Sequence, residues 1–159
     1  MTPQEITEKL KAKFGEAIVD AKLEGVIDPF IKIKAESWKD VALFLRDDSD
    51  FQFDYLMCLS GVDYGKGVIG VVYHFASMSK KHKITIKVEV TREKPEIPSV
   101  ESIWRTADWH EREAYDLVGV IFTGHPDLRR ILLPNDWEGH PLRKDYKVPE
   151  YYQGMKVPY

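Results

Sequence analysis

Apolar residues recur at helical spacing in two places in the first fifty residues. Near the N-terminus three of them, Ile6, Leu10 and Phe14, lie four residues apart, which is the spacing of one helix face. Thr2 and Glu5 form a capping-box pattern around Pro3, so a helix is expected to begin at Pro3 and to end at Gly15. A second stripe, made of Trp38, Val41, Ala42 and Leu45, predicts another helix after Ser37.

Apolar and polar residues alternate between and after these helices, as they do in half-buried strands. The expected strands cover residues 17–23, 30–34, 55–62, 68–77 and 83–91. The glycines of the Tyr64–Gly67 stretch predict a hairpin turn, because glycine tolerates positive φ. The run from Val68 to Ser77 is almost wholly apolar in its middle and is expected to be a central strand. This pattern predicts an α+β fold, with two helices packed on one face of a mostly antiparallel sheet.

The second half of the chain changes character after Pro98. Ser99 is expected to start a pair of helical runs that reach Val118, with Gly119 as the stop and residues 120–122 as a short strand. From Thr123 onward the sequence is rich in Gly, Pro, Trp and Arg and shows little periodicity. We therefore expect an α+β domain over residues 1–122 that includes this helix pair, and an extended, loop-rich tail over residues 123–159.

Composition excludes several classes of protein. The chain has 159 residues, 43% of them hydrophobic, and a net charge of −3, which argues against disorder and against general nucleic-acid binding. No stretch approaches the roughly 18 uncharged apolar residues of a membrane span. The single cysteine, Cys58, rules out an internal disulfide.

Basic residues are divided unevenly along the chain. Thirteen of sixteen lysines lie at or before Lys94, whereas five of seven arginines and three of four tryptophans lie between residues 104 and 143. Arg and Trp are enriched at interface cores, where Lys is depleted. This window is either a docking surface or a loop-rich region fastened by internal pairs of arginine and carboxylate, and the composition leaves both interpretations open.

The sequence offers few candidates for catalysis. Glu111 and Glu113 lie about 200° apart on a helix, so they cannot flank one substrate bond together. The apolar stripe places Glu111 on the buried side, where it is expected to pair with an arginine; acid/base catalysis by these glutamates is the alternative. The five histidines have no zinc-site spacing, and the glycines of residues 65–70 serve a hairpin, not a phosphate loop. No cofactor or metal is expected in this chain.

Two adjacent runs, residues 109–119 and 122–132, resemble the signature of one family. That family is the 30-kDa subunit (the C subunit) of NADH:quinone oxidoreductase, respiratory complex I or NDH-1. The signature positions are filled by Glu111, Arg112, Glu113, Asp116, Leu117, Val118, His125, Arg129, Ile131 and Leu132. The block of residues 136–146 is also similar to the C-terminal block of the family in its unfused form.

The resemblance implies a non-catalytic structural subunit in the quinone module of the peripheral arm. Such a subunit holds no flavin or iron–sulfur cluster, is inactive alone, and contacts the 49-kDa-type subunit of the quinone module and neighbouring iron–sulfur subunits. The resemblance implies that the tail of residues 123–159 wraps the 49-kDa-type subunit, with Tyr151, Tyr152 and Tyr159 extending along it. It would lie on the cytoplasmic side of the prokaryotic inner membrane, or on the stromal face of a thylakoid. The expected interface or ion-pair residues are Glu111, Arg112, Glu113, Asp116, His125, Arg129, Arg130, Trp137, Arg143, Lys144, Asp145 and Tyr146. The equivalent subunit of a membrane-bound hydrogenase is an alternative, and the electron donor is left open.

Overall fold

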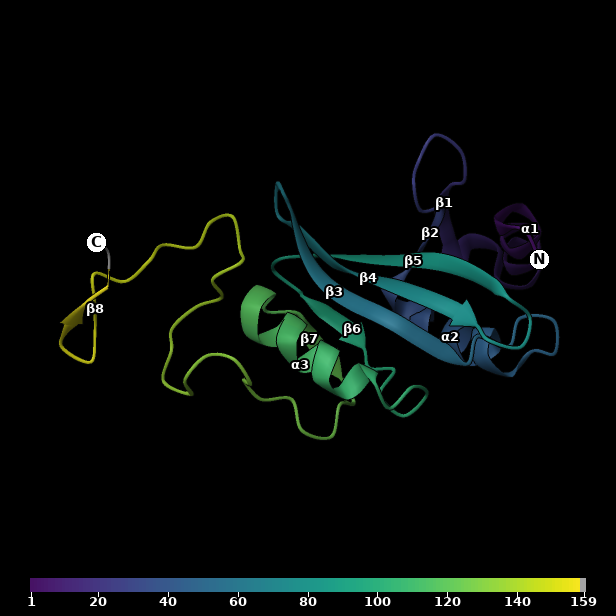
Figure 1. The fold of residues 1–159 in the computed structure, drawn as a ribbon. Helices are drawn as coiled ribbons and strands as arrows, with labels where there is room; N and C mark the ends of the chain where they lie inside the picture. The colour runs from purple at the N-terminus through teal and green to yellow at the C-terminus, as the bar shows by residue number, and fades with distance from the viewer. Residues whose placement is uncertain (158–159) are drawn as a thin grey trace.

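Residues 1–157, which the computed structural model describes, form three α-helices and a five-stranded sheet (Figure 1). The strands are β1 (Ile18–Lys22), β2 (Phe30–Ile33), β3 (Tyr55–Gly65), β4 (Val68–Ser77) and β5 (His82–Thr91). Their spatial order is β1-β2-β5-β4-β3, and every neighbouring pair is antiparallel except β2 with β5. That pair is parallel because the chain crosses from β2 to the far edge before it returns through β4 to β5.

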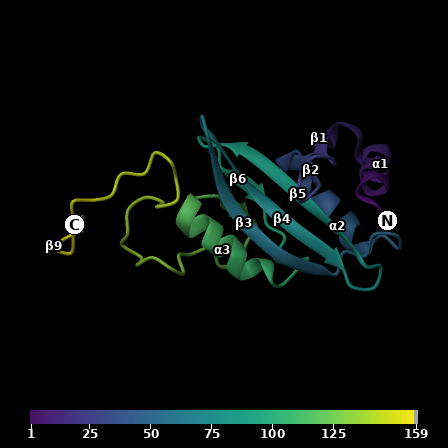
Figure 2. The ribbon, with the colours of Figure 1, turned by 45° about the horizontal axis from the view of Figure 1, so that its top comes forward.

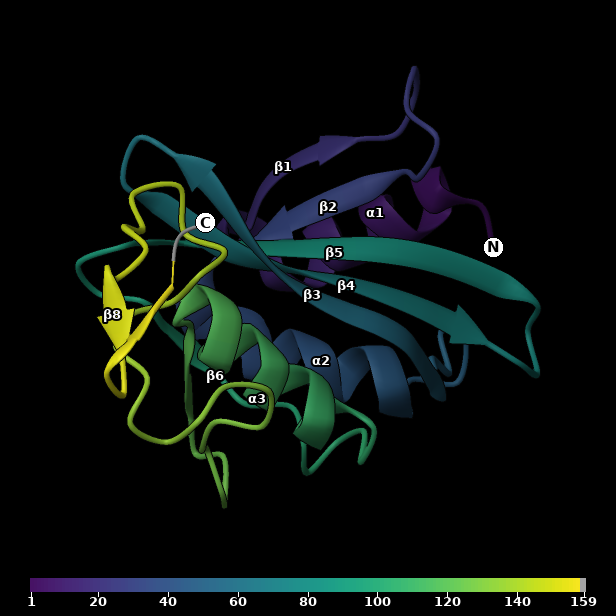
Figure 3. The ribbon, with the colours of Figure 1, turned by 60° about the vertical axis from the view of Figure 1, so that its left-hand side comes forward.

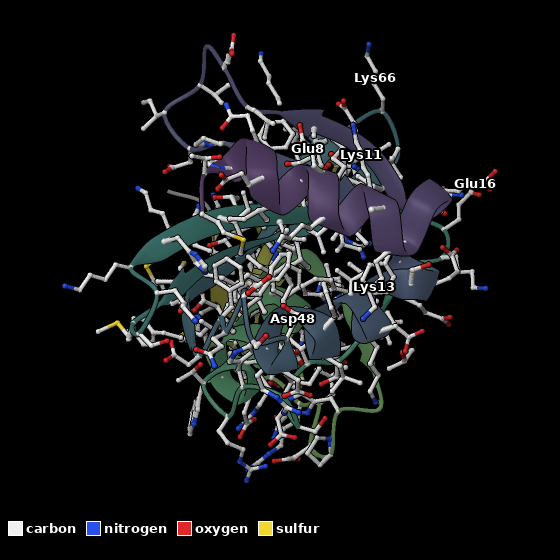
Figure 4. The ribbon with its side chains drawn as sticks, turned by 90° about the vertical axis from the view of Figure 1, so that its right-hand side faces the viewer. Glu8, Lys11, Lys13, Glu16, Asp48 and Lys66 are labelled. Atoms are coloured by element: carbon white, nitrogen blue, oxygen red, sulfur yellow. The ribbon has the colours of Figure 1, made fainter. Side chains whose placement is uncertain are left out.

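The two N-terminal helices, α1 (Pro3–Phe14) and α2 (Trp38–Asp47), confirm the sequence predictions. The Thr2–Glu5 capping box is formed, and all four stripe residues of α2 are buried. Ser37 makes no side-chain cap, because a short 3₁₀ turn (Ala35–Ser37) already leads into α2. Charged side chains cover the outer side of α1, as Figure 4 shows for Glu8 and Lys11, so this helix is amphipathic, with its apolar side on the sheet.

The hydrophobic core lies between the helices and one face of the sheet. Aromatic rings form its centre: Trp38 of α2 packs on Tyr73 of β4 at a centroid distance of 4.6 Å, and Phe75 packs on Trp104 at 4.5 Å. The Trp104 indole also donates a hydrogen bond of 2.8 Å to the Phe53 carbonyl oxygen. These contacts join β4, α2 and the turn before α3 in one core.

The region after β5 differs in part from the prediction. The expected helix pair is a series of turns followed by the single helix α3 (Ala107–Val118), and β6 (Glu96–Pro98) pairs in parallel with β7 (Ile121–Thr123). Helix α3 packs on β3 so closely that a Cβ atom on Gly61 would lie 3.0 Å from the Cβ of Ala114. In Figure 3, α2 and α3 lie on the same side of the sheet. The α+β fold is therefore confirmed, with a third helix in the helical layer.

After β7 the chain continues without a long regular element. A small hairpin of β8 (Tyr151–Tyr152) and β9 (Met155–Lys156) lies far from the sheet in Figures 1 and 2. No helix within residues 1–157 is both long and apolar enough to cross a bilayer. The domain boundary at residue 122 stays a prediction.

Candidate functional site: the C-terminal segment and its anchors

Residues 123–157 are here called the C-terminal segment. Buried polar contacts attach it to the body, and Asp116 accepts more of these hydrogen bonds from the segment than any other side chain within residues 1–157. The carboxylate of Asp116 is fully buried at the end of α3. Its Oδ2 accepts the amide N–H groups of Ile131, Leu132 and Leu133 at 2.8–3.0 Å, and Arg130 donates to its Oδ1 at 2.7 Å. Burial alone would raise the pKa of Asp116, but these hydrogen bonds outweigh burial and lower it. Asp116 is therefore an ionised anchor for the start of the segment.

Arg143 forms the second anchor, at the C-terminal end of α3. Its Nε donates to the Val118 carbonyl oxygen at 2.7 Å, and its Nη2 donates to the Gly119 carbonyl oxygen at 3.3 Å. A cation at this position satisfies helix carbonyls and opposes the negative end of the helix dipole. Gly119 has a φ of 80°, and a Cβ on it would lie 2.4 Å from the Arg143 guanidinium, so a residue with a side chain would be strained here and would displace Arg143.

Asp63 of β3 forms the third anchor, which sequence reasoning missed. It accepts the Lys144 amide N–H at 2.9 Å, the Gly65 amide N–H at 2.7 Å, and two hydrogen bonds from Arg92. Arg92 also pairs with Asp145 at 2.8 Å. Burial acts to raise the pKa of Asp63, yet the hydrogen bonds and the Arg92 charge lower it. The sequence did contain one signal: Asp63 is a carboxylate at a position of its strand where the side chain faces the core.

Glu111 is buried as predicted, but the prediction that it pairs with an arginine is wrong. Ser99 and Val100, which directly follow β6, supply its hydrogen bonds, from a hydroxyl at 2.6 Å and an amide N–H at 2.8 Å. Burial is the main cause that raises the pKa of Glu111 to about 7, and the nearby charges of Glu101 and Asp108 add to it. A hydroxyl and an amide suffice because they satisfy both oxygens of the carboxyl group.

Of three other signature residues, Glu113 and Arg129 are exposed, whereas Arg112 is buried. Glu113 is exposed on the other side of α3 from Glu111. The guanidinium of Arg112 lies 4.9 Å from the centre of the Trp109 ring, and its Nε donates to the Arg129 carbonyl oxygen at 3.4 Å. Arg129 itself pairs with Asp127 at the surface. Within residues 1–157, neither Arg112 nor Arg129 pairs with a buried carboxylate. Arg92 and Arg130 pair with the buried Asp63 and Asp116.

The outer part of the segment has its own small cluster. Trp137 donates from its indole nitrogen to the Tyr146 hydroxyl at 3.0 Å and packs on Tyr152 at a ring distance of 5.0 Å. Tyr152 also donates to Asp136 at 2.8 Å. Tyr159, which was expected to extend along a partner, lies outside the described residues.

Large apolar side chains on this part of the molecule face solvent. They are 57–63% exposed, and they comprise Trp109, Leu132, Leu142, Val148, Tyr151 and Met155. Arg130, Arg143 and the amides of residues 131–133 face the anchors, whereas these apolar side chains face outward. Such an arrangement is typical of a surface that is covered in an assembly.

The geometry does not favour catalysis by the two glutamates. A groove of about 580 Å³ lies at the ends of β2 and β5, lined among others by Lys32, Lys34 and Glu89, and neither Glu111 nor Glu113 lines it. Within residues 1–157, no group of three or more His, Cys, Asp or Glu side chains is placed to hold a metal ion. An α+β body with a tethered segment and an uncovered apolar surface defines the class of a subunit of a larger assembly.

The family is shown by comparison with known proteins. A model described as "Respiratory-chain NADH dehydrogenase, 30 Kd subunit" matches residues 31–152, and the chain belongs to this family. The C subunit of NADH-quinone oxidoreductase from Chloroherpeton thalassium is 55% identical over 151 residues, which are 94% of this chain and 63% of that protein. The C subunit from Chlorobium phaeobacteroides is 49% identical over 152 residues, 94% of this chain and 92% of that protein. The chain thus spans less than two thirds of the first relative.

Solved structures share the fold. The structure described as "Nqo5 of the trypsin-resistant fragment (1-134)" matches with a TM-score of 0.69 and 26% identity, over 80% of this chain and 100% of the fragment. A chain of the membrane-bound sulfane sulfur reductase, an archaeal respiratory membrane complex, matches with a TM-score of 0.74 over 91% of this chain and 85% of its own. At 24% identity the second match shows the fold alone. The family predicted from the signature is confirmed.

Proposed function

We propose that this chain is a non-catalytic scaffold subunit in the quinone module of a complex I-like oxidoreductase. The whole complex would pass electrons from NADH or another donor to quinone and couple that transfer to proton translocation. The chain itself would hold no flavin or iron–sulfur cluster and would be inactive alone. One observation carries the proposal: the C-terminal segment is fastened firmly at Asp116, Arg143 and Asp63, yet its outer apolar side chains are more than half exposed.

The partner we propose is the 49-kDa-type subunit, with iron–sulfur subunits nearby. The anchors hold residues 128–146 against the body, so the following residues leave from a fixed point and reach away from the sheet (Figure 2). A preorganised segment binds with a smaller loss of conformational entropy than a free one. Membrane contact would come only through the complex, on the cytoplasmic side of the inner membrane or the stromal face of a thylakoid.

Co-purification from cells that make both subunits tests this proposal. A chain truncated after residue 146 keeps all three anchors, and Tyr151→Asp places a charge on the proposed contact surface. Both variants are expected to keep the melting temperature of the chain and to lose the 49-kDa-type subunit. Met78→Asp is the matched control, because Met78 is 68% exposed in the β4–β5 turn at the opposite end of the sheet.

Two results would contradict the proposal. Undiminished binding by the truncated chain would show that residues 147–159 are not the contact. A flavin or iron–sulfur absorbance, or NADH oxidation by the purified chain, would show that the chain is catalytic.

A further inference from the structure

A buried carboxyl group lies where the C-terminal segment leaves the body. Glu111 of α3 has no exposed surface. Its Oε1 accepts the Val100 amide N–H, and its Oε2 lies 2.6 Å from the hydroxyl of Ser99, which in turn accepts the Glu101 amide N–H at 3.2 Å. Ser99 also donates its own amide N–H to the Thr123 carbonyl oxygen at 2.9 Å. Glu111 therefore joins α3 to the ends of both β6 and β7.

His125 lies at the same junction, two residues after β7. Its side chain is fully buried, and its Nδ1 accepts the Asp127 amide N–H at 3.0 Å. The other ring nitrogen, Nε2, is buried and has no hydrogen-bond partner among residues 1–157. It lies 3.3 Å from Asp108 and 3.9 Å from Glu111, so the histidine ring lies directly beside the two carboxyl groups.

The other charged and titratable groups that face Glu111 are acidic or neutral. Glu101 comes from the turn after β6 and Asp108 from the first turn of α3, and both raise the pKa of Glu111 after the main effect of burial. Tyr73 of β4 has a buried hydroxyl, and its pKa is raised by burial and then by the Glu111 charge. Arg105 pairs with Glu101 and is itself exposed. Within residues 1–157 no lysine or arginine pairs with Glu111, so an ionised Glu111 would be a buried charge beside two other carboxylates.

We propose that Glu111 is a proton-binding site at the base of the C-terminal segment, and that loss of its proton in the neutral pH range loosens residues 123–127. Ser99 and Val100 donate to Glu111 and favour its carboxylate, but burial and the charges of Asp108 and Glu101 outweigh these two bonds and favour the neutral acid. Loss of the proton would leave a buried negative charge that repels Asp108 and Glu101. The junction of β6, α3 and the segment is consequently firmer below pH 7 than above it. This property belongs to the chain alone and does not depend on the proposed function.

Nuclear magnetic resonance on the full chain between pH 5.5 and 8.5 tests the proposal. The amides of Val100 and Asp127 report directly on Glu111 and His125, and both are expected to shift with one midpoint near pH 7. Hydrogen exchange of residues 123–127, corrected for its intrinsic pH dependence, is expected to rise about tenfold between pH 6 and 8, as the loss of one proton requires.

Glu111→Gln keeps a neutral side chain at every pH and is expected to remove both the midpoint and the rise in exchange. Glu113→Gln is the matched control, because Glu113 lies on the same helix but is exposed, and it is expected to leave both unchanged. A Val100 midpoint that survives Glu111→Gln would overturn the proposal. If that variant does not fold, carbon-13 spectra of the wild-type glutamate carboxyls decide: a midpoint near 7 supports the site, and midpoints all below about 5 refute it.

Discussion

Asp116→Asn is expected to release the C-terminal segment while the α+β body stays folded. The variant keeps the size of the side chain but removes the charge that three amides and Arg130 share. One oxygen of the amide group can still accept, whereas its NH₂ group would face donors. Removing one partner of a buried ion pair costs about 3–5 kcal/mol, and we take about 3 kcal/mol because Arg130 keeps a bond to the Gly139 carbonyl oxygen.

That loss belongs to the segment, because the amides that bind Asp116 all lie in it. About 3 kcal/mol corresponds to a rise on the order of 100-fold in the hydrogen-exchange rates of the Ile131–Leu133 amides. Amides in β4 and β5 are expected to keep their protection. Trypsin is expected to cut the variant faster at Arg129 and Arg130. Asp127→Asn is the matched control, since its pair with Arg129 is at the surface and contributes no more than about 1 kcal/mol.

The pH dependence of this anchor follows from the sign of the pKa shift. The pKa of Asp116 is lower in the folded chain than in the unfolded one, so its contribution is present above the unfolded value of 3.8. It is lost as the pH falls through the folded pKa. Equal exchange rates for Asp116→Asn and the control, or a uniform loss of protection over the whole chain, would refute this account of the anchor.

Two further predictions concern the body. Gly61→Val would place side-chain atoms against α3, because even a Cβ atom on Gly61 would lie 3.0 Å from the Cβ of Ala114. Chemical denaturation should show that this variant loses about 1–3 kcal/mol of unfolding free energy. Ser60→Val, on the exposed side of β3, should show no such loss. Asp63→Asn should free the Lys144 amide, so that trypsin cuts the variant faster than the wild type after Lys144 at pH 7. The difference in the stability of this anchor between variant and wild type should vanish as the pH falls through the lowered folded pKa of Asp63. Undiminished protection at Lys144 would refute the second prediction.

Local patterns were enough to predict most of the body. The Thr2–Glu5 capping box, the α2 stripe and the strand alternation depend on neighbours within about one turn or one strand, and each is present in the structure. The region from Ser99 to Ala107 was less predictable, because Val100, Ile103 and Trp104 are buried in turns whose apolar spacing resembles that of a helix. Ile103 and Trp104 both donate their amides to the Val100 carbonyl oxygen, so this stretch forms isolated turns and not a continuous helix.

The anchors were predictable only in part. Asp116, Arg130 and Arg143 were among the candidates, because the family signature and the arginine-rich window include them. Asp63 and Arg92 were not, since they lie outside that window and only the fold brings them to Lys144 and Asp145. The interface role of these candidates remains a prediction that the co-purification experiment tests.

The sequence by itself determined most of the helices and strands of the body and the family to which the chain belongs, because both depend on residue types at short, fixed spacings. The tertiary structure decided which group each buried carboxylate contacts. Ser99 lies 12 positions from Glu111, Leu132 lies 16 from Asp116, and Lys144 lies 81 from Asp63. Burial demands a partner for such a group but does not specify which one. The partner is fixed by packing, which brings one particular amide, hydroxyl or guanidinium within reach.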